Sequence, residues 1–211
     1  METAMNLQSR PDIPPLPMTI DQFFDWAAQQ ERRYELVDGV PEVLPFVKRN
    51  HSRIVSNLLV GLSRQIDRAS FEVATGDFAV ATGPRSIRYA DVIVEKAGGG
   101  GEERMTEHAI LLVEVLSPST RRVDFGPKTR EYLALSSLDT YLILDQEKRK
   151  AWQWTRDHGG RWPENAKVFD DANTVLTLAS IGAQLSFDEI YRSVSGLPAP
   201  PADDRGAPND R

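Results

Sequence analysis

Three carboxylates of this 211-residue sequence lie in or beside apolar, strand-like segments. Glu114 is flanked by hydrophobic residues within 111–116, and Asp91 opens the run Asp-Val-Ile-Val. Glu35 lies in Tyr-Glu-Leu-Val, just before an Asp-Gly turn. A buried charge is costly unless it is paired or binds a metal, so a single strand carboxylate is ordinarily a solvated or arginine-paired residue. The neighbours of Glu114 leave little room for a solvated face, which makes Glu114 a functional candidate.

A Pro-containing turn and a helical segment rich in cationic side chains follow Glu114. Lys128 and Tyr132 in that segment are four residues apart and therefore share one helical face. Carboxylates, a lysine and an arginine-rich turn are the groups that metal-assisted hydrolysis of a phosphodiester requires. Hard oxygen ligands hold Mg²⁺ or Mn²⁺, and the metal lowers the pKa of a bound water. The lysine orients that water or neutralises the charge that grows on the phosphate.

The elements that must position these residues alternate between helical and strand-like patterns. Helices are predicted after a Thr19 N-cap, from Asn50 to Ile66 and over residues 125–135, because apolar residues recur there at helical spacing. Strands are predicted at 34–37, 40–44, 71–74, 78–81, 91–94, 109–115, 140–144, 150–155 and 175–178, with Ile190 closing a β-rich end. This order predicts an α/β fold with a mixed central sheet flanked by helices.

The length and composition predict one folded domain with short extensions. Residues 1–17 hold four prolines and are expected to form an extended lead-in. Residues 18–192 are expected to form the domain, and residues 193–211, rich in Pro and Asp, a disordered tail. A content of 40% hydrophobic and 27% charged residues is ordinary for a globular protein, which excludes a wholly disordered or fibrous chain.

The charge balance and the absence of cysteine exclude several classes of function. The formal net charge of −6 argues against tight, non-specific coating of DNA, although a metal-dependent nuclease needs acidic ligands. Because the sequence has no cysteine, disulfides, thiolate metal sites and cysteine nucleophiles are excluded. No apolar run is long enough to span a membrane, and the N-terminal residues lack the pattern of a signal peptide, so a cytoplasmic protein is expected.

Taken in order, these residues resemble the Uma-two type of restriction endonuclease, a bacterial family once classed as a domain of unknown function, within the PD-(D/E)XK nuclease superfamily. The resemblance spans residues 18–192, and its most specific segment is Glu-Val-Leu-Ser-Pro-Ser-Thr at 114–120. The other matching positions are 34–39, His51, 91–94, Asp124, Lys128, Tyr132 and 141–145. The resemblance implies a restriction-endonuclease-like core that carries an N-terminal helix and hairpin.

The resemblance also implies roles for individual residues. Asp91 and Glu114 resemble the metal-binding aspartate and glutamate of the family, and Glu35 resembles the acidic residue that the N-terminal part contributes. Two positions depart from the superfamily pattern, since Ala90 replaces the proline before the aspartate and Leu116 stands where a lysine usually follows the glutamate by two residues. The family resembles cases in which the lysine has moved to the following helix, and Lys128 is then the candidate.

These observations lead to two hypotheses of different class. The first is an endonuclease that hydrolyses DNA phosphodiester bonds with Mg²⁺ or Mn²⁺, in which Asp91 and Glu114 bind the metal, Glu35 is an auxiliary acid and Lys128 orients the water or the phosphate. The second is a catalytically silent nuclease fold that binds nucleic acid or protein. The net charge and the missing lysine at Leu116 favour the second hypothesis. The intact set of carboxylates favours the first.

Three further residues have open assignments. His51 is either part of the site or a cap at the start of its helix. Trp152 and Trp154 alternate on a strand and either stack bases or, as we favour, pack in the core or against a second subunit. A homodimer is expected, because sheet edges need covering and two subunits would suit the cutting of both strands of a duplex.

Overall fold

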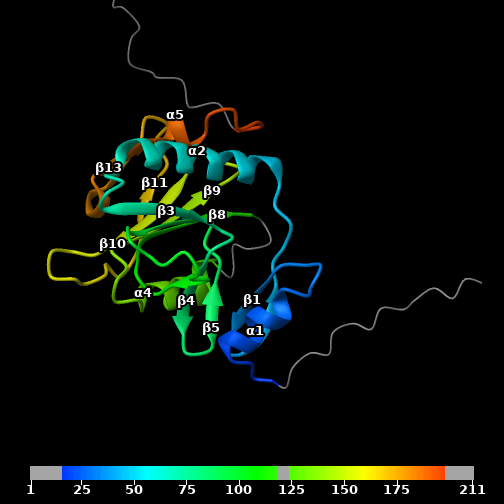
Figure 1. Ribbon diagram of the computed structural model, residues 1–211. Coiled ribbons are helices and arrows are strands. Elements are labelled where there is room, and N and C mark those ends of the chain that lie inside the picture. Colours follow the sequence, from blue (N-terminus) through cyan, green and yellow to red (C-terminus); the bar gives the residue numbers. More distant parts are fainter. Residues whose placement is uncertain (1–15, 118–123, 198–211) are drawn as a thin grey trace, which may run out of the picture.

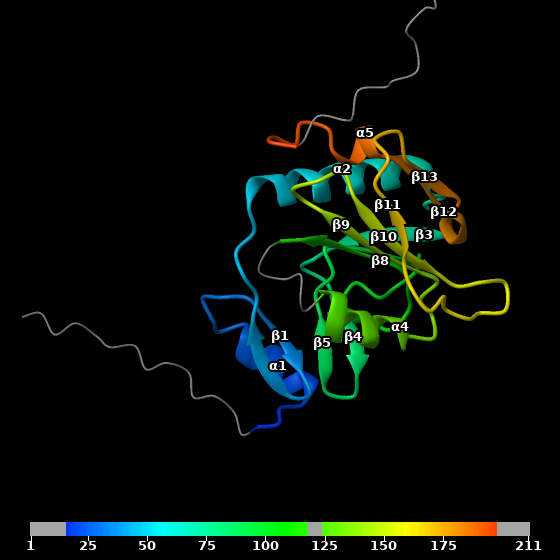
Figure 2. The same ribbon diagram turned by 180° about the vertical axis from the view of Figure 1, so that it is seen from behind.

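The computed structural model describes residues 16–117 and 124–197, which form an α/β fold around a six-stranded mixed sheet (Figures 1 and 2). The strands of this central sheet are, in spatial order, β11 (Lys167–Phe169), β10 (Ala151–Thr155), β9 (Thr140–Asp145), β8 (Ala109–Leu116), β6 (Val92–Lys96) and β3 (Phe71–Thr75). Strands β8 and β9 pair in parallel, and the other neighbours pair antiparallel. The predicted mixed sheet is confirmed, as is the hairpin of β9 and β10.

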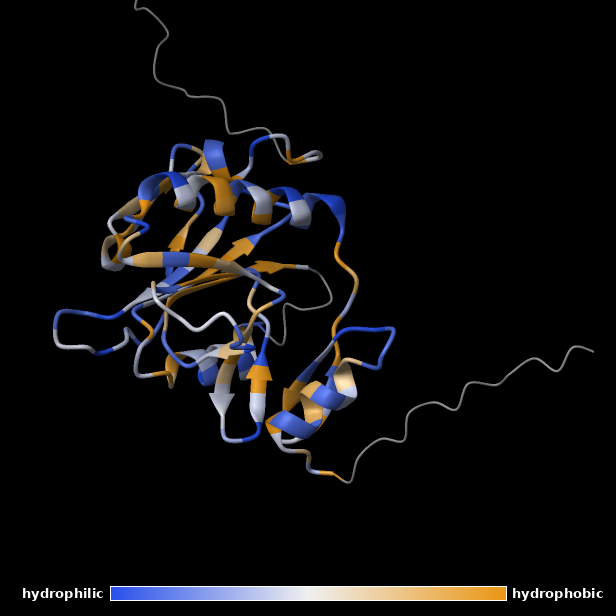
Figure 3. Cartoon of the chain, viewed as in Figure 1, coloured by the Kyte–Doolittle hydropathy of each residue, from blue (hydrophilic) through white to orange (hydrophobic). Residues whose placement is uncertain are grey.

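The central strand β8 is buried along its whole length, with side chains that alternate between two apolar layers. Leu111, Val113 and Val115 belong to the layer under the long helix α2 (Arg49–Gln65), whereas Leu112 and Leu116 belong to the layer on the opposite face. Hydrophobic residues gather on the central strands and on the side of α2 that faces them (Figure 3). Because strand residues two apart share a face, Glu114 points away from α2, between Leu112 and Leu116.

The face that carries Glu114 is covered by η1 (Asp124–Lys128), a single π-helical turn, and by the short helix α4 (Thr129–Leu133). Phe125 and Leu133 pack on the apolar layer beneath, as expected for a segment anchored on the sheet. The predicted helix over 125–135 is thus present, but it begins with a wider turn. Pro127 lies inside that turn, and proline has no backbone N–H for the ordinary helical hydrogen bond.

A second sheet, which the sequence did not predict, lies beside this covering layer (Figure 1). Its strands are, in spatial order, β2 (Val40–Val43), β1 (Tyr34–Val37), β5 (Ser86–Arg88), β4 (Ala79–Gly83) and β7 (Met105–Thr106). Leu36 of β1 and Ile87 of β5 are register partners and pack with Phe23 of α1 (Ile20–Ala27). By strand alternation, Glu35 and Arg88 lie on the opposite face of this sheet, toward η1 and α4.

The C-terminal part packs on the outer side of α2. It consists of the hairpin β12 (Val175–Leu178) and β13 (Ala183–Ser186), the 3-10 turn η2 (Ala179–Ile181) and helix α5 (Phe187–Ile190). The expectation that Ile190 closes a β-rich end is wrong, because Ile190 is the last residue of a helix. Ser186 and Glu189 form a capping box that starts this helix, a signal present in the sequence.

The remaining expectations divide into three groups. Trp154 is buried and stacks on Tyr141 at 5.5 Å between ring centroids, while Trp152 meets Phe125 edge-on at 4.9 Å, so both tryptophans are packing residues. Most of the predicted lead-in and tail lies outside the described residues. In the described part of the chain, no helix is both long and apolar enough to cross a membrane.

Candidate active site

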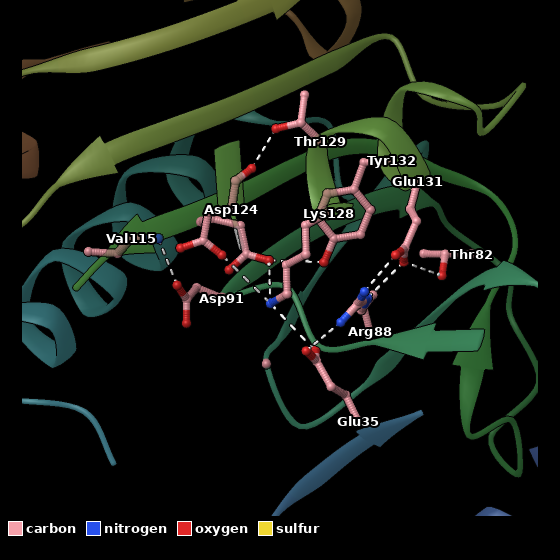
Figure 4. Close-up of polar contacts among 12 residues, drawn as sticks. Glu35, Thr82, Arg88, Asp91, Val115, Asp124, Lys128, Thr129, Glu131 and Tyr132 are labelled. Atoms are coloured by element: carbon pink, nitrogen blue, oxygen red, sulfur yellow. Dashed lines mark hydrogen bonds and ion pairs between the residues drawn. The ribbon is translucent and has the colours of Figure 1, made fainter. Parts of the chain in front are cut away.

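Asp91 and Glu114 meet because β6 and β8 are neighbours. Val92 pairs with Val113 in the antiparallel ladder, which places Asp91, one residue before β6, beside Glu114 on β8. The Asp91 Oδ2 atom accepts a hydrogen bond of 2.7 Å from the backbone N–H of Val115 and lies 3.1 Å from Nε2 of His51 (Figure 4). The structure therefore brings together the two carboxylates that the sequence singles out, and it adds His51 to the site.

Lys128 is buried among three carboxylates. Its Nζ atom lies 3.2 Å from Glu114 Oε1, 3.5 Å from Glu35 Oε2 and 3.9 Å from Asp124 Oδ1. Figure 4 shows the ammonium group between the side chains that come from β1, β8 and η1. A lysine fourteen residues after Glu114 thus takes the position in space that the departure at Leu116 leaves empty in the sequence pattern.

The proximity of these charges keeps Lys128 protonated. Burial alone would lower the pKa of its ammonium group, but the carboxylates of Glu114, Glu35 and Asp124 outweigh burial and raise that pKa above its usual value. A protonated amine donates hydrogen bonds and positive charge, and it cannot take up a further proton. Lys128 is therefore suited to orienting a water or a phosphate oxygen, and not to acting as a general base.

Glu114 carries the opposite tendency. Burial raises the pKa of its carboxyl group well above the usual value, Lys128 lowers it, and the neighbouring carboxylates Asp91 and Asp124 raise it further. The Tyr132 hydroxyl donates a hydrogen bond of 2.9 Å to Glu114 Oε1, the same oxygen that faces Lys128. The predicted shared face of Lys128 and Tyr132 thus points at one carboxylate oxygen.

Arg88 on β5 is the main residue that the sequence interpretation missed. Its side chain is 1% exposed, and Nη1 donates a hydrogen bond of 2.6 Å to Glu35 Oε1. Its Nε and Nη2 atoms donate to the two carboxylate oxygens of Glu131 on α4, at 2.7 and 2.5 Å. Thr82 donates a further hydrogen bond to Glu131. Arg88 therefore fixes Glu35 on one side and clamps the second sheet to α4 on the other (Figure 4).

The signals for the missed residues were weak. Strand β5 has only three residues, and Ser86, Ile87 and Arg88 give too short an alternation to predict a strand, although the Gly-Pro pair before them indicates a turn. Asp124 matches the family pattern and stands four residues before Lys128, the spacing of an ion pair on a helix. No such local signal identifies Glu131, whose partners lie 43 and 49 residues away in sequence.

A small pocket opens onto these groups. The site side chains that line it are Asp91, Glu114, Asp124, Lys128 and His51. The opposite wall is formed by residues 44–47, which connect β2 to α2, and by Arg33. In both ribbon views the 44–47 connection passes close to the end of β8, where the site lies (Figures 1 and 2).

The donor set fits a hard divalent cation. Both contacts to Asp91 use Oδ2 and both contacts to Glu114 use Oε1, so the second oxygen of each carboxylate has no hydrogen-bond donor among the described residues. Mg²⁺ typically takes one or two carboxylates and completes its octahedral shell with waters and substrate phosphates. Consistent with so few protein ligands, no group of three or more ligating His, Asp or Glu side chains occurs within 16–117 and 124–197.

Comparisons with known proteins point to one family. The model of the family Uma2, described as "Putative restriction endonuclease", matches residues 20–188. The uncharacterized protein slr1290 of Synechocystis sp. (strain PCC 6803) is 25% identical over 188 residues, which cover 88% of this chain and 97% of that protein. A second uncharacterized protein of the same organism, sll1609, is 26% identical over 135 residues, or 61% of this chain and 75% of that protein.

The fold has a counterpart among solved structures. The crystal structure of a "putative nuclease belonging to DUF820" from Anabaena variabilis superposes with a TM-score of 0.66 and covers 83% of this chain and 98% of its own. The two sequences are 16% identical, so this likeness concerns the fold alone. The restriction-endonuclease-like fold expected from the sequence is thereby confirmed.

Proposed function

Because this chain belongs to the Uma2 family, whose description is a restriction endonuclease, we propose that it is a metal-dependent endonuclease that hydrolyses phosphodiester bonds of DNA. The observation that carries the proposal is the convergence of Asp91, Glu114 and the protonated Lys128 on one pocket. Buried carboxylates with unshared oxygens beside a fixed cation are costly in a fold that needs them only for packing.

Asp91 and Glu114 would hold a Mg²⁺ or Mn²⁺ ion through the oxygens that face the pocket. When bound, such an ion lowers the pKa of a coordinated water and neutralises charge on the phosphate. The chain restrains both ligands, since Val115 N–H and His51 fix Asp91 while Tyr132 and Lys128 fix Glu114. Restrained ligands need little reorganisation when the substrate arrives.

Lys128 would act on the substrate side of the reaction. Hydrolysis of a phosphodiester builds negative charge on the phosphoryl oxygens and on the leaving oxygen, and an ammonium group stabilises that charge. Glu35 is a positioning residue in this scheme, because it holds Lys128 from the side opposite Glu114 and is itself held by Arg88. The scheme retains the predicted auxiliary role of Glu35 and adds Arg88 as its support.

The rival proposal is a silent nuclease-fold module that binds without cutting. The acidic net charge of −6 still favours it, since few positive charges remain for a DNA surface. Its second support, the missing lysine after Glu114, is weakened by the position of Lys128 in space. A homodimer would suit cleavage of both strands, but the tryptophans that suggested a subunit contact are used in packing within the chain.

Cleavage assays test the proposal. Purified protein is incubated with supercoiled, linear and single-stranded DNA in Mg²⁺, in Mn²⁺ and in EDTA. We expect nicking or cutting of at least one substrate that requires the metal and that disappears in Glu114→Gln. The matched control is Glu164→Gln, which removes an exposed carboxylate from a loop outside the site. Binding of DNA without cleavage in any metal would establish the rival module instead.

A further inference from the structure

The wall of the pocket opposite the carboxylates carries the most exposed large hydrophobic residue of the described chain. Phe46 is 91% exposed, and its neighbour Val47 is 58% exposed. Burial of an aromatic ring is one of the main stabilising contributions available to a fold, so a ring left almost wholly in water is available for a partner. Both residues nevertheless line the same pocket as Asp91, Glu114 and Lys128.

Positive groups follow Phe46 directly along the chain. Lys48 and Arg49 are exposed, and Arg49 is the first residue of the 17-residue helix α2. Lys48 is the N-cap residue of this helix and makes no side-chain capping hydrogen bond. The uncapped N–H groups and the helix dipole at this end favour an anion such as a phosphate. An aromatic ring beside cationic groups is the combination that proteins use to hold single-stranded nucleic acid.

We propose that Phe46 stacks on an unpaired base of the substrate next to the scissile phosphate, while Lys48 and Arg49 contact the adjoining phosphates. The inference rests on the proposed nuclease function and adds a substrate class to it. A base inside a duplex has no free face for Phe46, so the site favours DNA that has unpaired bases at the cleavage position, such as single strands, gaps or frayed ends.

Position favours nucleic acid over a second copy of the chain as the partner of Phe46. A subunit bound over residues 44–47 would close the pocket that holds Asp91 and Lys128. A nucleotide strand, by contrast, can contact Phe46 with a base and the pocket with its phosphate. The neighbouring Val40 and Val43 on the edge strand β2 are 44% and 41% exposed, and they extend the apolar strip away from the pocket.

The test measures binding separately from cleavage. Fluorescence anisotropy in EDTA gives the affinity of wild type, Phe46→Ala and Phe46→Tyr for a single-stranded oligonucleotide and for its duplex. An oligonucleotide that carries 2-aminopurine reports stacking as quenched fluorescence. Val168→Ala is the control, because Val168 is 47% exposed on β11, at the far edge of the central sheet.

We expect Phe46→Ala to weaken single-strand binding by about 5- to 100-fold, the range for loss of one stacked base, and to restore 2-aminopurine fluorescence. Phe46→Tyr and Val168→Ala should bind like wild type, and duplex affinity should change by less than about threefold. Unchanged single-strand affinity in Phe46→Ala, or no binding by wild type, would overturn the inference.

Two further outcomes separate this inference from others. Light scattering that shows a wild-type dimer, and a monomer for Phe46→Ala with unaltered DNA affinity, would assign Phe46 to a subunit contact and overturn the inference. Binding that depends on Phe46 without cleavage in Mg²⁺ or Mn²⁺ would uphold the stacking role and refute only the nuclease reaction. Cleavage that is insensitive to Phe46→Ala would leave the nuclease standing and remove the stacking role.

Discussion

Glu114 is the residue on which most contacts of the site converge. Its Oε1 atom accepts from both Lys128 and Tyr132, and Asp91 lies beside it on the neighbouring strand. The sequence already indicated a functional role, because a carboxylate between Leu112 and Leu116 has no route to solvent on either side of a covered strand. What the sequence could not give is which oxygen is held and by which groups, since the donors come from a helix that follows a separate turn.

Replacement of Lys128 by methionine tests the role of the cation. We expect the single-turnover cleavage rate to fall by ~10²–10³-fold with little change in DNA affinity, because the ammonium group acts mainly on charge formed in the transition state. Lys150→Met is the control, since Lys150 pairs with Asp170 outside the site. Equal cleavage rates for wild type and Lys128→Met would remove the lysine from the mechanism.

The same substitution has a cost in stability that the rate measurement must take into account. Lys128→Met leaves Glu114, Glu35 and Asp124 without their shared cation, and loss of one partner from a buried pair costs about 3–5 kcal/mol. Denaturation curves should therefore be recorded for both lysine variants. The rates are then compared at a temperature where both variants are folded.

Tyr132 offers a milder change at the same carboxylate. Tyr132→Phe removes the hydroxyl that donates to Glu114 Oε1 and keeps the ring, so we expect a loss of about 1 kcal/mol in the free energy of unfolding. Tyr141→Phe is the matched control, because that hydroxyl makes only a long contact of 3.4 Å with the backbone oxygen of Asp124. Urea denaturation that shows an equal or larger loss for Tyr141→Phe would contradict the assigned hydrogen bond.

At the scale of elements, the site depends on the contact between the second sheet and α4. Glu35 on β1 and Arg88 on β5 lie across neighbouring strands, and Glu131 on α4 completes the clamp. The π-helical turn η1 lies between the end of the masking turn after β8 and α4, and it ends at Lys128. Such turns are frequent at functional sites, where they re-aim one side chain relative to a regular helix.

Arg88→Met tests the clamp. The variant leaves Glu35 and Glu131 without their buried partner, and we expect the free energy of unfolding to fall by about 3–5 kcal/mol. The control Arg149→Met breaks an ion pair with Asp188, whose side chain is 80% exposed, and should cost about 0–1 kcal/mol. Similar losses in the two variants, measured by thermal or urea denaturation, would show that the clamp does not stabilise the fold.

At the scale of the whole molecule, local patterns predicted the elements better than their arrangement. The apolar periodicity of α2 and the Asp-Gly turn between β1 and β2 are local signals, and both elements form as expected. The second sheet depends on pairing of β1 with β5, which lie about fifty residues apart, and nothing in either strand specifies its partner. Arg88 was missed for the same reason, because its role exists only once those strands are paired.

The candidate site was more predictable than the sheet that supports it. Asp91, Glu114 and Lys128 were identified from costly charges in apolar segments, from helical spacing and from a family resemblance, and the structure gathers them into one pocket. Asp124 and Glu131 were left out because each is an ordinary acidic residue until the fold supplies its cationic partner.

The most direct test of the central claim is metal binding measured in the absence of DNA. Isothermal titration calorimetry with Mn²⁺ or Mg²⁺ compares wild type with Glu114→Gln and Asp91→Asn, and Glu164→Gln controls for loss of an exposed carboxylate outside the site. Circular dichroism establishes that every variant is folded. The account predicts that wild type and Glu164→Gln bind the ion with the same affinity, whereas Glu114→Gln and Asp91→Asn lose this binding. An unchanged affinity in folded Glu114→Gln would contradict the assignment of the metal site.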